Sequence, residues 1–263
     1  HVLMEKPMAL TTADCDRMLD ASRKYGRKLC IVHNVLFHPP LIKVRKLVAE
    51  GAIGDFTGMN IFLSDPRDEM IMRKDYWIHK LPGGLMGETG PHVVYLSLAF
   101  LGKVTNVDIY TKNFLEHSWA PFDEFRIELE GENGMSSVAI SYTSNRYAAY
   151  VDILGMEGAL HADLQSMLVI RQGAKTSLSP RSLVSTSLGS VLQTVSGLLA
   201  NSLKVATGRF RVGHETVIEQ FVNSILSDTQ PPVTGEEGRE VVKVMEMVVE
   251  KLYHKYGRPQ PVE

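Results

Sequence analysis

The first seven residues, His1-Val2-Leu3-Met4-Glu5-Lys6-Pro7, constrain the fold more than any other segment of the chain. An apolar run that closes on Glu-Lys-Pro is typical of a buried strand that carries a lysine at its end. Proline then ends the strand, because it has no N–H to donate to a neighbouring strand. Ligands bind beyond the carboxyl ends of parallel strands, so Lys6 is a candidate functional residue. The alternative is an ordinary surface charge at a strand end.

A helix and a second strand follow this segment. Thr11-Thr12-Ala13-Asp14 is typical of a helix start, since a hydroxyl caps free amides and an acid favours the first turn. Gly26 offers a C-cap, and residues 29–35 form a second strand-like run. Residues 1–38 therefore predict a β–α–β unit of a parallel sheet, which two strands cannot stabilise alone. We expect further strands before His1, so that the first part of this domain is absent.

The pattern changes from residue 39 onwards. Pro39-Pro40 opens a helix that stops at Gly51. The remainder predicts a mainly antiparallel sheet that is interrupted by a helix near 88–101 and closed by two C-terminal helices. The expected strands are residues 56–64, 104–112, 124–130, 135–143, 148–154 and 167–171. The last helix is expected to begin at Thr234-Gly235-Glu236-Glu237, which forms a capping box.

Composition excludes several classes of function. The 263 residues carry a formal net charge of -2, without the basic excess that a nucleic-acid surface requires. Cys15 and Cys30 have no partner at metal-ligand spacing, which predicts reduced cytosolic thiols and no metal site. No signal peptide or membrane-spanning run is visible, so we expect a cytoplasmic protein.

Residues 181–207 form a helical pattern of unusual composition. One face is an apolar stripe of Val and Leu, whereas the opposite face is Ser, Thr, Gly and Asn with almost no charge. We favour a helix that packs on the sheet or in a subunit interface. Contact with a lipid surface is the less favoured alternative, because the flanking cations Arg181, Lys204, Arg209 and Arg211 are sparse.

A second cluster that could carry chemistry lies between Pro82 and His92. Gly83 and Gly84 let the backbone approach a ligand closely before the chain turns into a helix. Glu88 and His92 are four residues apart and share one helix face, where a carboxylate can orient an imidazole that acts as general base. The alternative is a capping glutamate and a structural histidine. Metal binding is disfavoured, because no third ligand follows at a recognisable spacing.

Taken together, these segments resemble the glucose–fructose oxidoreductase/inositol dehydrogenase/MocA (Gfo/Idh/MocA) family. The resemblance rests on the strand–Glu-Lys-Pro–helix–strand order and on the Gly-Gly-x-x-x-Glu-x-Gly-x-His pattern of residues 83–92. Residues 37–39 with 50–54 are similar to the family's crossing between domains, and Phe221 with residues 231–238 to its C-terminal helices. The resemblance covers nearly the whole chain in the right order.

The resemblance implies a fold of class α/β plus α+β. Residues 1–38 would be the C-terminal remnant of a dinucleotide-binding Rossmann parallel sheet. Residues 39–263 would form an open-faced, mainly antiparallel α/β domain of the dihydrodipicolinate-reductase type, which binds substrate and mediates oligomerisation. A homodimer or homotetramer through the open sheet is expected.

The resemblance also implies an activity: NAD(P)-dependent hydride transfer to or from a sugar, an inositol or a related polyol. Lys6 would stabilise alkoxide charge, and His92 would take the hydroxyl proton. Glu88 would orient His92 or hold a substrate hydroxyl. Glu5, Lys6 and Pro7 would contact NAD or NADP. The expected substrate pocket comprises Lys6, Trp77, Lys80, Glu88, His92 and Tyr95.

Several departures from the family pattern favour alternatives. Glu88 stands where the family usually has Asp, Leu36 replaces a common Arg, Pro82 stands where the glycine run often begins, and Tyr95 sits where an Asp often follows the His. No Gly-x-Gly-x-x-Gly motif follows a strand in this chain. We therefore expect the 263-residue form to bind NAD(P) poorly and to turn over little. The alternatives are a non-catalytic sugar-binding or regulatory member of the family and a purely structural oligomerisation module.

Overall fold

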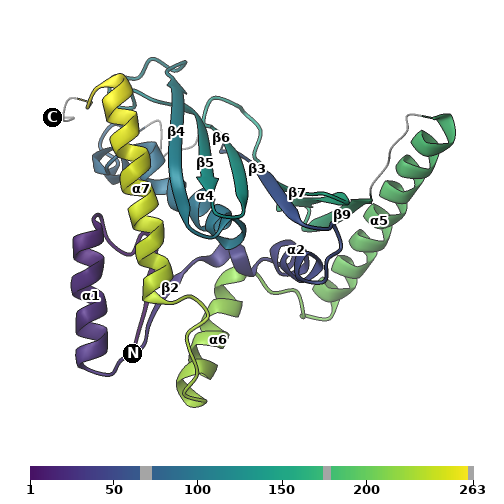
Figure 1. Cartoon of the computed structure of the whole chain (residues 1–263), viewed down its shortest axis with the longest axis horizontal. Coiled ribbons are helices and arrows are strands. Elements are labelled where there is room, and N and C mark those ends of the chain that lie inside the picture. Colours follow the sequence, from purple (N-terminus) through teal and green to yellow (C-terminus); the bar gives the residue numbers. More distant parts are fainter. Residues whose placement is uncertain (66–72, 174–178, 260–263) are drawn as a thin grey trace.

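The computed structural model describes residues 1–65, 73–173 and 179–259. A small parallel unit near the N-terminus lies beside a large sheet, and the last helix runs along both (Figure 1). A long helix projects from the opposite end of the sheet. The structure is mixed α/β with a mainly antiparallel sheet, as the sequence predicts.

The N-terminal unit is the expected β–α–β arrangement. Strands β1 (Val2–Glu5) and β2 (Leu29–Val32) pair in parallel, with Glu5 opposite Val32 at their carboxyl ends. Helix α1 (Thr12–Lys24) connects them, and the Thr11 side chain accepts a hydrogen bond from the Asp14 amide. The second strand is shorter than predicted, because the chain turns into a 3₁₀ helix, η1 (Asn34–Phe37). This turn places Asn34 close to the end of β1.

The large sheet has seven strands in the order β4-β5-β6-β3-β7-β8-β9. Their bounds are β3 Phe56–Ser64, β4 Val104–Lys112, β5 Glu124–Gly131, β6 Gly134–Ser141, β7 Ala148–Gly155, β8 Gly158–Asp163 and β9 Leu168–Gly173. Strand β3 lies between β6 and β7 and pairs with β6 in parallel, whereas the other strand pairs of this sheet are antiparallel. Strand β8 was not predicted, because its short run of Gly, Ala and His has weak strand propensity.

Helices cover one face of this sheet. They are α2 (Pro39–Ala49), α4 (Leu85–Leu101) and α7 (Gly235–Tyr256). The short helix η2 (Trp77–Lys80) packs on α4, and α6 (Gly213–Leu226) packs against η1 and β2 of the N-terminal unit. Helix α4 packs against β3, β5 and β6, and α7 packs against β4. Alternate side chains of β5 are buried, whereas Arg126 and Glu130 on its other side are exposed, as expected for an open-faced sheet.

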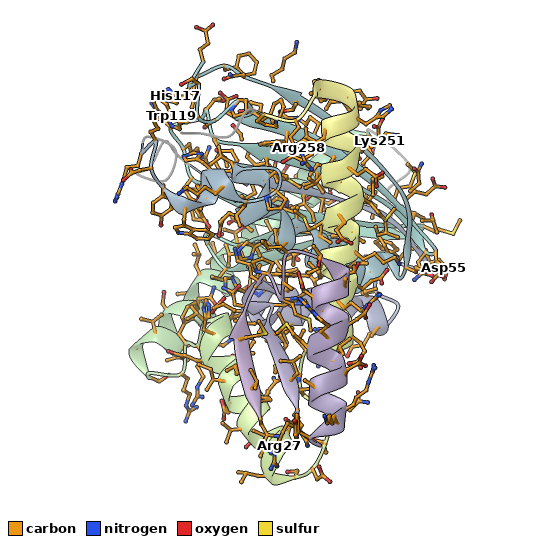
Figure 2. All side chains as sticks on the ribbon, turned by 90° about the vertical axis from the view of Figure 1, so that its left-hand side faces the viewer. Arg27, Asp55, His117, Trp119, Lys251 and Arg258 are labelled. Atoms are coloured by element: carbon orange, nitrogen blue, oxygen red, sulfur yellow. The ribbon has the colours of Figure 1, made fainter. Side chains whose placement is uncertain are left out.

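Helix α7 joins the two units. The predicted capping box is present, because Thr234 and Glu237 exchange side-chain and backbone hydrogen bonds at its start. A Cβ added to Gly238 would lie 2.4 Å from Cγ1 of Ile31, so only glycine allows α7 to approach β2 this closely. Helix α1 lies alongside the same helix, as Figure 2 shows from the side.

The apolar helix contacts the sheet at its edge, and its expected place in a subunit interface stays a prediction. Helix α5 (Pro180–Ala206) touches the edge strand β9, but none of its residues is buried. By length and composition it is the one helix among the described residues that could cross a membrane. Its apolar side chains face away from the body of the protein.

Candidate active site

Lys6 leaves the carboxyl end of β1 and reaches helix α4. Its Nζ lies 2.5 Å from Oε1 of Glu88 and donates a second hydrogen bond, of 2.8 Å, to the Glu88 carbonyl oxygen. Only 10% of the Lys6 side chain and 24% of the Glu88 side chain are exposed. The interpretation of Lys6 as a freely solvated surface charge therefore does not describe this structure. The pair brings together two segments that are 82 residues apart in sequence.

A glycine turn sets the position of Glu88. Gly83 and Gly84 have φ angles of 81° and 58°, which a residue with a Cβ rarely adopts. A Cβ on Gly87 would lie 2.4 Å from the Pro82 carbonyl oxygen, so the turn also needs glycine at that position. Glu88 then lies in the first turn of α4, where the helix dipole favours a carboxylate.

His92 is held by Tyr95 rather than by Glu88. Nδ1 of His92 lies 2.7 Å from the Tyr95 hydroxyl, which donates to Oδ1 of Asn34 at 3.3 Å. The same hydroxyl accepts from the Val35 amide at 3.2 Å. We infer that the hydroxyl proton goes to Asn34, so that His92 carries its proton on Nδ1 and offers Nε2 as the proton acceptor.

The charge states follow from burial and from Lys6. Burial, reinforced by the Lys6 ammonium, lowers the pKa of His92 to about 4, although the Glu88 carboxylate acts in the opposite direction. Burial alone would raise the pKa of Glu88, but its charge and hydrogen-bond interactions with Lys6 hold it below the usual value. At neutral pH the site thus combines a carboxylate with a neutral imidazole, which can accept a proton.

Two neighbours of Tyr95 were missed by the sequence analysis. His33 stacks on the Tyr95 ring with centroids 4.4 Å apart, and burial lowers its pKa to about 3, so it is also neutral. Asn34 is the acceptor for the Tyr95 hydroxyl. The available signal was their position, because both follow the second parallel strand at the edge where ligands bind.

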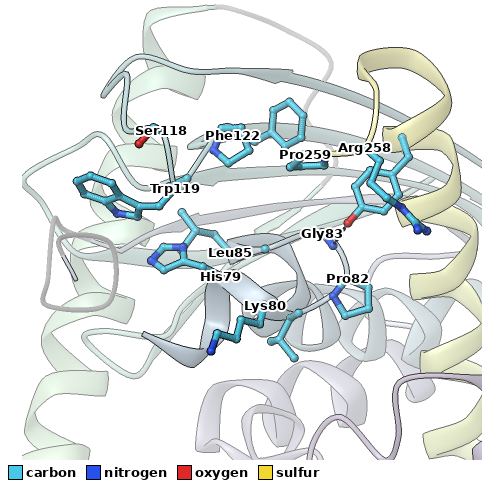
Figure 3. A pocket seen from close by; sticks show the side chains of 15 residues that line it. His79, Lys80, Pro82, Gly83, Leu85, Ser118, Trp119, Phe122, Arg258 and Pro259 are labelled. Carbon is cyan, nitrogen blue, oxygen red and sulfur yellow. Dashed lines mark hydrogen bonds between the residues drawn. The ribbon is translucent and has the colours of Figure 1, made fainter. Parts of the chain in front are cut away.

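The other predicted residues lie around this cluster or apart from it. The Glu5 side chain is 65% exposed, with its carboxylate 3.5 Å from Nε2 of His214. Pro7 lines a cavity of about 540 Å³ against α7. Lys80 lines a different cavity of about 480 Å³ beside Trp119, whose lining includes none of the three predicted catalytic residues (Figure 3). Trp77 is 54% exposed at the start of η2. The structure therefore brings together Lys6, Glu88, His92 and Tyr95.

Comparison with known proteins identifies relatives along the chain. Residues 41–161 match the model of the GFO/IDH/MocA C-terminal domain. The dTDP-3,4-didehydro-2,6-dideoxy-alpha-D-glucose 3-reductase of Streptomyces violaceoruber is 32% identical over 176 residues, which are 62% of this chain and 47% of that protein. The uncharacterized oxidoreductase YrbE of Bacillus subtilis is 24% identical over 100% of this chain and 71% of its own length. The chain thus spans about half the length of the first of these relatives.

Solved structures share the fold. The WlbA dehydrogenase of Bordetella pertussis, in complex with NADH and UDP-GlcNAcA, superimposes with a TM-score of 0.72 at 18% identity. The match covers 100% of this chain and 73% of that chain. A putative NADPH-dependent oxidoreductase of Desulfitobacterium hafniense gives a TM-score of 0.73 at 16% identity, with the same coverage of 100% and 73%. At these identities, the two structures establish the arrangement of helices and strands.

Proposed function

Because this chain belongs to the Gfo/Idh/MocA family of oxidoreductases, we propose that it transfers a hydride between a nicotinamide cofactor and a hydroxyl-bearing carbon of a sugar, an inositol or a related polyol. One observation carries this proposal: the end of a parallel strand delivers Lys6 to a helix that also holds Glu88 and a neutral histidine. The curated relatives include a scyllo-inositol 2-dehydrogenase and a D-xylose dehydrogenase, which act on substrates of this class.

In the proposed reaction, His92 and Lys6 act on the substrate oxygen. Nε2 of His92 accepts the hydroxyl proton, while Tyr95 keeps Nδ1 protonated and the ring in place. The Lys6 ammonium stabilises the negative charge that develops on the oxygen. Glu88 offsets part of the burial cost of the imidazolium that forms, since its carboxylate raises the pKa of His92.

The residues present fit the nicotinamide end of NAD or NADP. When bound, the cofactor supplies the acceptor or donor of the hydride. Glu5, Lys6 and Pro7 stand at the carboxyl end of β1, which is the edge of a parallel sheet at which dinucleotides bind. These three residues would contact the cofactor, and we assign residues 1–38 to the cofactor domain and 39–263 to the substrate domain. The relatives give no support to the expectation of weak cofactor binding and low activity.

The remaining parts of the proposal concern the pocket and the assembly. Trp77 and Lys80 are proposed to contact a substrate that extends beyond the central cluster. The exposed side of the large sheet is proposed to form a homodimer or homotetramer interface in a cytoplasmic enzyme. The non-catalytic and purely structural alternatives predict no role for His92 in turnover, and no comparison supports them.

The test is a cofactor-linked assay of the purified gene product. Its intact mass, compared with the 29.3 kDa of these 263 residues, records which form is assayed. NAD or NADP is supplied with a panel of sugars and inositols, and absorbance at 340 nm reports turnover. We expect activity with at least one polyol and a loss of 10²- to 10⁴-fold in His92→Ala, the range typical of a general base.

The matched control is His254→Ala, which removes an exposed histidine from the last turn of α7. We expect it to retain activity within twofold of the parent. Activity that survives in His92→Ala would remove His92 as the base. A protein that binds a polyol but shows no turnover in either direction would instead support the non-catalytic alternative. Clear turnover by a 29.3 kDa protein would contradict the expected inactivity of the 263-residue form.

A further inference from the structure

A third cavity, of about 550 Å³, lies where the N-terminal unit, α2, α4 and α7 meet. Its volume is within the roughly 300–1,000 Å³ that is typical of sites for small molecules. Tyr95 contributes to its wall, but none of the three proposed catalytic residues does. Much of the wall is apolar and comes from Leu36, Phe37, Leu98, Ala99 and Val241. The proposed catalysis therefore leaves this cavity without a role.

His33 and Tyr95 form the buried part of this wall. Each residue is only 2% exposed, and their rings stack on each other. The Tyr95 hydroxyl already has three hydrogen-bond partners. Neither ring nitrogen of His33, in contrast, has a hydrogen-bond partner within the part of the chain that the structure describes. Buried polar groups nearly always have such a partner, so a group that enters the cavity would complete the site.

The chemistry of His33 indicates what that group is. Burial lowers the pKa of His33 to about 3, so its ring is neutral at neutral pH. A neutral imidazole offers one N–H donor and one nitrogen acceptor. It therefore suits an uncharged polar group, such as a hydroxyl or a carbonyl, and not an ion. The apolar wall beside it suits a flat ring, whose faces need no hydrogen bonds.

The rim of the cavity carries charges of both signs, but only its acids have partners. Arg45 of α2 and Lys103, which follows α4, are exposed and form no ion pair with any described residue. On the α7 side, Glu240 lies 2.9 Å from Nζ of Lys243. Glu237 is engaged in the capping box at the start of α7. The charge available to a ligand at the rim is therefore positive, which favours an anionic group.

We propose that this cavity binds a flat aromatic carboxylate whose opposite end carries a hydroxyl or a carbonyl group. The ring packs on the apolar wall, the carboxylate faces Arg45 and Lys103, and the uncharged group bonds the His33 imidazole. The ligand would also contact Tyr95, whose hydroxyl lies 2.7 Å from Nδ1 of His92. Binding itself is independent of the proposed catalysis, whereas any effect of the ligand on turnover rests on the proposed function.

The experiment is isothermal titration calorimetry with 6-hydroxy-2-naphthoate, which carries a carboxylate and a hydroxyl at opposite ends of a flat ring system. Two analogues each remove one of the proposed contacts. 2-Naphthoate lacks the hydroxyl and is expected to bind about fivefold more weakly, the typical effect of one neutral hydrogen bond. 6-Hydroxy-2-naphthamide lacks the charge and is expected to bind about tenfold more weakly, since two exposed cations face the carboxylate.

Two variants change the cavity at exposed positions, so that folding is not at risk. Ala99→Trp places an indole in the cavity from the surface of α4 and is expected to abolish binding of the hydroxynaphthoate. Its matched control is Ala21→Trp, at an exposed position of α1 outside the cavity. Arg45→Glu combined with Lys103→Glu is expected to remove the preference for the acid over the amide.

The control for the charge reversal is Lys43→Glu combined with Arg27→Glu. Both residues are exposed and lie outside the lining of the cavity, and Lys43 lies on the opposite side of α2 from Arg45. This control makes the same change in net charge and is expected to keep the tenfold preference for the acid.

A spectroscopic measurement tests the contact with His33 directly. In protein labelled with ¹⁵N-histidine, which has nine such residues, the hydroxynaphthoate is expected to shift the imidazole signal that is absent from His33→Gln. The proposal is overturned if the hydroxynaphthoate shows no saturable binding, or if Ala99→Trp binds it as well as the parent does. It is also overturned if the acid and the amide bind equally, or if the acid competes with the polyol substrate, which would assign the cavity to the substrate site. Binding without any polyol turnover would leave this proposal standing and count only against the proposed function.

Discussion

Replacing Lys6 by Met tests the central contact of the site without requiring a substrate. The variant leaves the largely buried Glu88 carboxylate without its cation, and breaking a buried pair from one side typically costs 3–5 kcal/mol. Glu88 keeps a 3.0 Å hydrogen bond from the Thr89 hydroxyl and is 24% exposed, so we expect the lower part of that range. The expected loss is about 3 kcal/mol at pH 8, or roughly 6–12 °C in Tm for a chain of this size.

The sign of the pH dependence makes this prediction specific. In the parent, the folded pKa of Glu88 lies below its ordinary value of 4.5, so its stabilisation is present above that pH and is lost as pH falls through the folded pKa. Without Lys6, burial dominates and raises the folded pKa above 4.5. The carboxyl then takes up a proton while still folded. The deficit of Lys6→Met relative to the parent must therefore shrink between pH 8 and pH 5.

Urea unfolding followed by circular dichroism at the two pH values measures this deficit. The control is Lys46→Met, because the Lys46 side chain is 73% exposed and its Nζ lies 3.7 Å from Oε1 of Glu50. We expect that control to change stability by less than about 0.5 kcal/mol at either pH. Adding Glu88→Gln to Lys6→Met should recover part of the loss, since no buried charge remains. A deficit that is unchanged or larger at pH 5 would refute the reasoning.

Three further predictions concern the same helix and its surroundings. Tyr95→Phe leaves Nδ1 of His92 without its partner, and we expect a loss of about 2 kcal/mol in urea unfolding together with a displaced pH–rate profile. The folded pKa values of His33 and His92, about 3 and about 4, lie below the ordinary 6.5. The free energy of unfolding should therefore be highest above pH 6.5 and fall by about 3 kcal/mol per histidine towards pH 4. A free energy of unfolding that does not change over this pH range would contradict the prediction. Gly87→Ala should lower the free energy of unfolding by about 1–3 kcal/mol, because the added Cβ would lie 2.4 Å from the Pro82 carbonyl oxygen. The control Gly189→Ala has open space around it and should be neutral or slightly stabilising.

The sequence predicted the bounds of individual strands better than it predicted which strands pair with one another. The bounds of β3 and β4 agree with the structure, because alternating apolar residues and flanking turns are local signals. The insertion of β3 between β6 and β7 has no such signal, since the same alternation fits either neighbour. Beyond the early end of β2 at Val32, the Val35 amide donates to the Tyr95 hydroxyl of α4. That contact spans 60 positions and is invisible to local pattern.

The candidate site was likewise predicted from the sequence only in part. The spacing of Glu88 and His92 correctly predicted a shared helix, and the Glu-Lys-Pro ending correctly predicted a lysine at the end of a parallel strand. The sequence could not show that Lys6 and Glu88 would bond each other, because this depends on how α4 approaches β1. Tyr95 was expected to line the substrate pocket. Its hydrogen bond to His92, three residues earlier on the helix, is a contact that helical spacing could have suggested.

Glu88, which stands where the family usually has Asp, bonds Lys6 in this structure, whereas Tyr95 bonds His92. The carboxylate of Glu88 bonds Lys6 through Oε1 and the Thr89 hydroxyl through Oε2, so both oxygens already have partners. Tyr95 orients His92 instead, and the imidazole receives only the electrostatic influence of Glu88. Ring orientation and charge compensation, which one carboxylate can provide together, are thus supplied here by two residues. Because the Tyr95 hydroxyl is neutral, it holds the ring without adding a charge to a buried site that already contains one ion pair. This arrangement keeps His92 in its proton-accepting form at neutral pH and leaves Lys6 paired before any substrate binds.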